Sequence, residues 1–194
     1  MNDIKIPWFR YAIIAYLAKH IGEKTQFGKT ALQKLIYLLQ EAYNVPLGYE
    51  FKFYHYGPFS SDLLGDLDYV DYLHGVSVEF EHSLGWYFIK PGAESEKIIK
   101  KGEEFLNTFS KQIDSIIKNF RNYTAGSLEL RSTLVYVSKE IEQEGKPCSD
   151  DDLLTKTKSL KPGFTDEAIK NAIDELRNKN LICKATEETC HSFF

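Results

Sequence analysis

The order of the apolar patterns over residues 1–92 is the feature that most constrains the fold of this chain. Apolar residues recur first at three- and four-residue steps, which is typical of helices, and later alternate in the way typical of strands. The patterns predict, in order, helices over 8–21 and 30–43, a strand over 49–56, a helix over 60–75, and a hairpin from 76–80 and 86–90. Gly57-Pro58 predicts the turn between strand and helix, and the whole order predicts a winged-helix-like unit.

The sequence after residue 92 reads as helical. "PGAESEK" predicts a boundary, and apolar residues at helical spacing predict one long helix over 95–122. Its apolar seam faces another helix, either in this chain or in a second copy. Further helices are expected over 128–143 and behind the caps Ser149 and Thr165. We therefore expect a mostly α protein with a small antiparallel β-sheet, divided into domains 1–92 and 93–194.

Residues 60–75 occupy the place of a DNA-reading helix but carry the wrong charge for one. Such a helix needs Arg, Lys, Asn or Gln to meet base edges and phosphates. This segment has none of them and carries four aspartates, which are Asp62, Asp66, Asp68 and Asp71. Carboxylates repel phosphate, so direct DNA reading by this helix is not favoured. Two interpretations stay open: a solvated helix face, which base rates favour, or an acidic surface that meets a basic partner.

Net charge, apolar runs and cysteine usage bear on what the protein can bind and where it is located. The net charge of −4 gives the chain no positive field that would attract a phosphate backbone. The apolar run at 11–18 is too short for a membrane span, and no segment resembles a secretion signal. Three cysteines, Cys148, Cys183 and Cys190, form no C-x-x-C pair, which favours a reducing compartment over a disulfide framework or zinc site. We therefore expect a cytoplasmic protein with no membrane segment.

Patterns typical of active sites are missing from the sequence. It has no H-x-x-x-H helix pair, no G-x-S-x-G elbow and no glycine-rich phosphate loop. Asp62 and Asp66 could pair as carboxylates, but acid–base chemistry also needs a pocket. We expect no enzyme, no catalytic residue, no cofactor and no metal.

Two stretches carry a resemblance to known families. "LQKLIYLLQEA" at 32–42 is followed by "YEFKFYHYGPFSSDL" at 49–63, with the likeness carried by Lys34, Leu35, Tyr37, Tyr56, Gly57, Pro58 and Leu63. This pairing resembles the Panacea or SocA-like antitoxins and their YwgA-like relatives. It also resembles the toxin-capturing domain that follows the macrodomain in DarG-type antitoxins. "LELRSTLVYVSKEI" and "KPGFTDEAIKNAIDELRNKNLI" are similar to the C-terminal half of YwgA-like proteins.

The resemblance implies a non-enzymatic module from bacterial or phage toxin–antitoxin and defence loci. Since the chain has no macrodomain, removal of ADP-ribose is not implied. In this interpretation the partner is a basic toxin or defence effector, and aromatic residues anchor the contact. The expected partner-binding residues are Tyr54, Tyr56, Phe59, Asp62, Asp66, Asp68, Tyr69 and Tyr72. Lys34, Tyr37, Gly57 and Pro58 are expected to be structural, with the stem of Lys34 running along an apolar stripe to water.

The alternative is a winged-helix transcriptional regulator that binds DNA as a dimer through the helix at 95–122. Its best support is the last helix, where Lys170, Asn171, Arg177 and Lys179 could touch phosphates. Four acidic residues interleave with them, which favours a solvated amphipathic helix.

Overall fold

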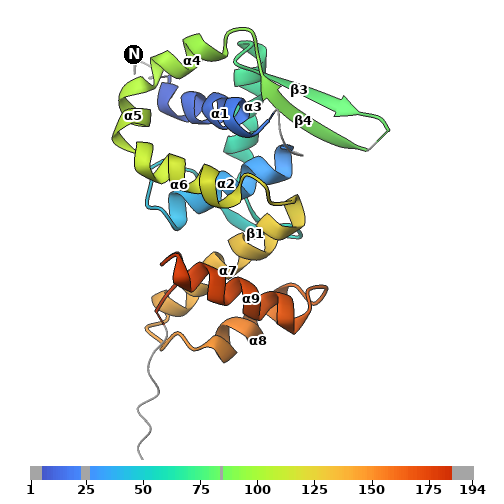
Figure 1. Cartoon of the computed structure of the whole chain (residues 1–194), viewed down its shortest axis with the longest axis vertical. Coiled ribbons are helices and arrows are strands. Elements are labelled where there is room, and N and C mark those ends of the chain that lie inside the picture. Colours follow the sequence, from blue (N-terminus) through green and yellow to red (C-terminus); the bar gives the residue numbers. More distant parts are fainter. Residues whose placement is uncertain (1–5, 23–26, 84, 185–194) are drawn as a thin grey trace, which may run out of the picture. The chain divides into compact units, whose positions relative to one another are not determined.

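The computed structural model describes residues 6–22, 27–83 and 85–184 (Figure 1). The chain forms two compact units, Met1–Glu129 and Leu130–Phe194, called here the first and the second unit. The expected division at residues 92 and 93 is not where the units separate. The three helices between residues 95 and 120 pack on the first two helices of the chain, which places them in the first unit.

Helix α1 (Trp8–Ile21) lies at the centre of the first unit. Its apolar residues surround the helix, and eight of its residues are buried, which is typical of a helix enclosed on all sides. It packs on α3, α4, α5 and β4 (Figure 1). Helix α2 (Lys29–Glu41) buries the residues from Ala31 to Leu39 and packs on α6 and β2. The residue before α2 is Gly28, and the helix begins one residue earlier than the expected start at residue 30.

The aromatic strand is shorter than expected and folds back on itself. Strand β1 (Lys52–Tyr54) pairs antiparallel with β2 (Gly57–Phe59), and the turn falls at His55 and Tyr56. Gly57-Pro58 therefore begins a strand, and the expected turn there is wrong by two residues. Gly57 has a φ of 83°, a conformation that only glycine adopts without strain, and this brings the chain out of the turn.

Helix α3 (Ser61–Tyr72) and the hairpin of β3 (Val76–Glu81) and β4 (Trp86–Pro91) follow as expected. Val76 and Ile89 lie on the hairpin face that meets the core, and both are buried. The order of elements matches the winged-helix expectation. Strand β1 pairs with β2, and β3 pairs with β4, so the described residues form two separate two-stranded sheets.

The predicted long helix over 95–122 is wrong. The segment forms α4 (Ser95–Lys101), α5 (Glu103–Thr108) and α6 (Ser110–Phe120), with breaks at Gly102 and Phe109. A side chain at residue 102 would overlap Ala12 of α1, so the chain bends where it passes that helix. The seam residues Ile98, Ile113, Ile116 and Phe120 are buried in this chain. Phe105 and Phe109, at the same spacing, are half-buried, so the seam is largely occupied within this chain, and a homodimer through it stays a prediction.

Helix α7 (Ala125–Gln143) begins in the first unit and continues into the second from Leu130. The second unit also contains α8 (Asp150–Leu160) and α9 (Asp166–Asn178). Both expected caps are confirmed: Ser149 Oγ accepts from Asp152 N at 3.0 Å, and Thr165 Oγ1 accepts from Ala168 N at 3.2 Å. Cys148 and Cys183 are joined by a disulfide, with their Cα atoms 6.1 Å apart. The expectation of no disulfide was therefore wrong: cysteines 35 residues apart meet because α8 and α9 bring them together.

The fold class is confirmed: the protein is mostly α with small antiparallel β-sheets. In the part of the chain that the structure describes, no helix has both the length and the apolar character needed to cross a bilayer.

Candidate functional site

Two buried side chains of α2 hold β2 in place. The Gln33 amide donates to Ser60 O at 2.8 Å, and its oxygen accepts from Ser60 N at 2.9 Å. The Lys34 ammonium donates to Pro58 O at 2.7 Å. Lys34 is only 2% exposed, so the expectation that its stem runs to water is wrong. These contacts fix the hairpin of β1 and β2 on α2. They explain why Lys34 and Gly57-Pro58 occur together in the sequence.

Tyr37 supports the same hairpin from one turn further along α2. It is buried, and its ring meets Phe51 edge-on with the centroids 5.1 Å apart. Its role is structural, as expected. The side chains of Gln33, Lys34 and Tyr37 thus connect α2 to the segment that carries the exposed tyrosines.

The hairpin of β1 and β2, together with α2 and α3, lines a cavity of about 170 Å³, called here the aromatic pocket. Its lining is mostly apolar and comes from Lys29, Thr30, Gln33, Lys34, Tyr54, Tyr56, Gly57, Phe59 and Leu64. Tyr54 and Phe59 form one wall, with ring centroids 5.5 Å apart. Tyr54 is 55% exposed and Tyr56 is 70% exposed, so both rings are available at the rim of the pocket.

A second cavity of about 140 Å³, called here the polar pocket, lies across the same wall. Tyr54 and Phe59 line it together with Glu50, Lys52, Ser61 and Asp62. Glu50 and Asp62 are exposed, and among the described residues neither has a cation within ion-pair distance. Four of the expected site residues, Tyr54, Tyr56, Phe59 and Asp62, are therefore brought together by the two pockets.

Asp66 has a different role from the one expected. Its carboxylate accepts from Tyr49 Oη at 2.8 Å and lies 3.8 Å from Arg10. Burial raises the pKa of Asp66, although Tyr49 and Arg10 both act to lower it. The carboxylate is held inside the first unit, so it is not part of an open acidic surface.

Asp68 is exposed but faces a lysine. Its carboxylate lies 4.0 Å from Lys29 Nζ, and that ammonium also lies 4.5 Å from the centre of the Tyr87 ring. The acidic surface expected from the sequence is thus smaller than four aspartates suggest. Beside the aromatic rings, Asp62 is exposed and has no ion-pair partner among the described residues. Glu50, which was not among the expected partner-binding residues, lies in the same pocket.

Tyr69 and Tyr72 form a separate group on α3. Their rings stack with centroids 6.2 Å apart, and Tyr69 also packs on Tyr11 at 5.3 Å. Neither residue lines the aromatic pocket or the polar pocket. Tyr69 packs on α1 through Tyr11 and Tyr72 is 77% exposed, so these two rings lie apart from the pockets that Tyr54, Tyr56 and Phe59 line.

Three exposed aromatic residues on the hairpin of β3 and β4 were missed: Phe80, Trp86 and Tyr87. Phe80 and Tyr87 are direct partners in the ladder, and they continue the core face of the hairpin beyond the body of the first unit. A cavity of about 250 Å³ lies between Trp86, Tyr87 and the start of α2. Alternation along β3 and β4 places Phe80 and Tyr87 on one face and Trp86 on the other, and nothing in the pattern indicated where the buried part of the first face ends.

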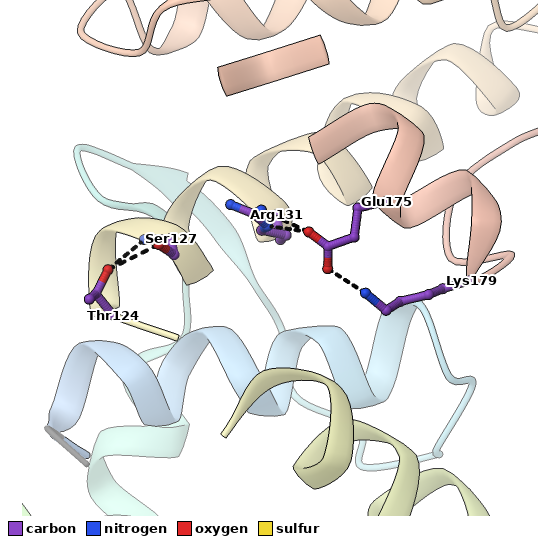
Figure 2. Close-up of polar contacts among 5 residues, drawn as sticks. All are labelled: Thr124, Ser127, Arg131, Glu175 and Lys179. Atoms are coloured by element: carbon purple, nitrogen blue, oxygen red, sulfur yellow. Dashed lines mark hydrogen bonds and ion pairs between the residues drawn. The ribbon is translucent and has the colours of Figure 1, made fainter. Parts of the chain in front are cut away.

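Two of the cations on which the DNA-binding alternative rested, Arg177 and Lys179, are paired within the second unit, whereas Lys170 is exposed and has no ion pair among the described residues. Arg177 lies 2.7 Å from Asp150 and donates to Cys148 O. Glu175 holds two cations at once, Arg131 at 2.7 Å and Lys179 at 2.5 Å (Figure 2). With Arg177 and Lys179 engaged, Lys170 is the cation of this set that stays available to a phosphate backbone, which is little for DNA binding.

Within residues 6–22, 27–83 and 85–184, no three His, Cys, Asp or Glu side chains are grouped so that they could hold a metal ion. Comparison with known proteins adds no identity, because no family model and no curated protein matches the chain.

Proposed function

We propose that this chain is a non-enzymatic protein-binding module, an antitoxin-like or phage-defence component that captures a basic partner protein. The observation that carries the proposal is the pair of exposed tyrosines, Tyr54 and Tyr56, at the rim of an apolar pocket. Tyrosine is enriched at protein interfaces because its ring buries a large apolar area while its hydroxyl stays hydrogen-bonded.

The rigidity of the site supports the same function. Lys34 bonds to Pro58 of β2, and Gln33 bonds twice to Ser60 just after it, so β2 is anchored on α2 before a partner docks. A binding surface that is already ordered loses less conformational entropy when the partner docks. Opposite charge at Glu50 and Asp62 would accelerate encounter with a basic partner.

The resemblance to SocA-like and DarG-type antitoxins supports the class of partner, a toxin or defence effector. Location in the cytoplasm belongs to the proposal on that resemblance alone, because the Cys148–Cys183 disulfide removes the argument from cysteine usage.

The test is co-expression with the protein encoded by the neighbouring gene, followed by purification through a tag on this chain. We expect a basic protein to co-purify with the wild type and to be lost from the double variant Tyr54→Ala, Tyr56→Ala. The matched control is Tyr69→Ala, Tyr72→Ala, which removes two tyrosines of α3 outside the pockets and should retain the partner. Equal recovery with all three proteins would refute the role of the aromatic pocket.

A salt titration against duplex DNA separates this function from the DNA-binding alternative. Binding through phosphates weakens by orders of magnitude between about 50 and 200 mM salt. We expect no DNA binding even at low salt. Tight binding that falls steeply with salt would favour the regulator and would contradict the proposal.

A further inference from the structure

The aromatic pocket and the polar pocket share a wall but differ in chemistry. The aromatic pocket has about the volume that accommodates one small ring, since a cavity of roughly 150 Å³ binds benzene. Its two cations are already engaged, Lys34 by Pro58 O and Lys29 by Asp68 and the Tyr87 ring. The pocket therefore suits an uncharged aromatic or branched aliphatic side chain.

The polar pocket has a net negative charge. Glu50 and Asp62 face it with a single lysine, Lys52, and all three side chains are exposed. A cationic side chain there would meet two carboxylates, and an anionic one would be repelled by them. Complementarity of charge therefore favours lysine or arginine.

The shared wall sets the spacing of the two side chains. Tyr54 and Phe59 line both pockets, so the two pockets adjoin at these rings. In an extended chain, residues i and i+2 project from the same face about 7 Å apart. Two side chains at that spacing can straddle one layer of rings and enter both pockets.

We infer that this site recognises a short extended segment of the partner in which an aromatic or branched aliphatic residue stands two positions from lysine or arginine. The inference rests on the proposed function, because it names the element of the partner protein that the site reads. It assigns the preference for a cation to Glu50 and Asp62, and it adds Leu64 as part of the lining that receives the apolar side chain.

The test uses two synthetic peptides, acetyl-Ala-Phe-Ala-Arg-Ala-amide and its Phe-Ala-Glu analogue, titrated into the isotope-labelled full chain and followed by amide chemical shifts. We expect shifts at Tyr54, Phe59 and Leu64, with the Arg peptide bound roughly 3- to 10-fold more tightly, as exposed charge pairs allow. The double variant Glu50→Lys, Asp62→Lys should lose or reverse this preference.

The control is Glu103→Lys, Glu104→Lys on α5, which makes the same change in net charge at exposed positions outside both pockets. It should keep the wild-type preference. Equal affinity for the two peptides, an absence of shifts, or shifts confined to other residues would overturn the inference.

Failure of the inference differs from failure of the proposed function in the co-expression experiment. A partner that is lost from Tyr54→Ala, Tyr56→Ala but fully retained by Glu50→Lys, Asp62→Lys would overturn the inference and leave the function standing. If the wild type captures no protein at all, the proposed function fails whatever the peptides do.

Discussion

Among single residues, Gln33 holds the end of β2 on α2. Its amide satisfies both backbone groups of Ser60, and it is only 3% exposed, so water cannot replace it. Gln40 does the same for Tyr49 at the other end of α2, with distances of 2.9 and 2.8 Å, but in a half-buried position. The same two hydrogen bonds from a glutamine to a backbone therefore occur twice, once buried at Gln33 and once half-buried at Gln40.

We predict that Gln33→Met lowers the free energy of unfolding by about 2 to 4 kcal/mol, because two buried backbone groups lose their partners. Gln40→Met should cost about 1 kcal/mol, since water reaches its site. Urea denaturation of both variants measures the difference. Equal costs would show that burial of the Gln33 amide is not what fixes β2.

The raised pKa of Asp66 predicts that the stability of the protein depends on pH. Burial raises its pKa in the folded state above the ordinary value of 3.8, so folding favours the protonated carboxyl. The stability that this group contributes is fully present below its unfolded pKa and is lost as the pH rises through the raised folded value. Asn keeps an oxygen that can accept from Tyr49 and carries no charge to bury.

The variant Asp66→Asn should therefore gain stability relative to the wild type as the pH rises from about 4 to 7. Urea midpoints of both proteins across this range provide the measurement. A difference that stays constant, or that moves in favour of the wild type, would show that Arg10 outweighs burial at this site.

At the scale of elements, close approach of backbones explains what the apolar pattern could not predict. Periodicity located α1, α3, the hairpin and the caps of α8 and α9, because each depends on residues near one another in the sequence. The break at Gly102 depends on Ala12, ninety residues earlier, and the pattern of 95–122 has no signal for it. The site divides in the same way: Tyr54, Tyr56 and Asp62 were predictable, whereas the pairing of Asp66 with Arg10 was not.

We predict that Gly102→Ala destabilises the protein by about 1 to 3 kcal/mol, because the new methyl group would overlap Ala12 and force α1 and α5 apart. Gly65→Ala is the control. Gly65 lies inside α3 with no atom near the position of a side chain, so alanine should stabilise by about 0.5 to 1 kcal/mol through helix propensity. Thermal unfolding of the two variants should shift in opposite directions, and a stabilised Gly102→Ala would contradict this account.

For the whole molecule, the two units are stabilised by different means. The first unit has a continuous apolar core around α1, with Ile13, Ile14 and Leu17 fully buried. The second unit buries fewer large side chains, and it adds the Cys148–Cys183 disulfide and the ion pairs of Arg131 and Arg177. Small cores gain most from such links, since they bury little surface for each residue that must be ordered.

The Cys148–Cys183 disulfide should stabilise the second unit and leave the first unit unaffected. Closing a loop of 35 residues constrains the unfolded chain by about 3 to 4 kcal/mol, so Cys183→Ser, or a reductant, should weaken the second unit by about that amount. Hydrogen exchange of the full chain should show α8 and α9 losing protection while α1 and α2 keep theirs. Cys190→Ser removes a cysteine and leaves the link, so it should behave as the wild type. Unchanged protection of α8 and α9 in Cys183→Ser would mean that packing alone holds this unit together.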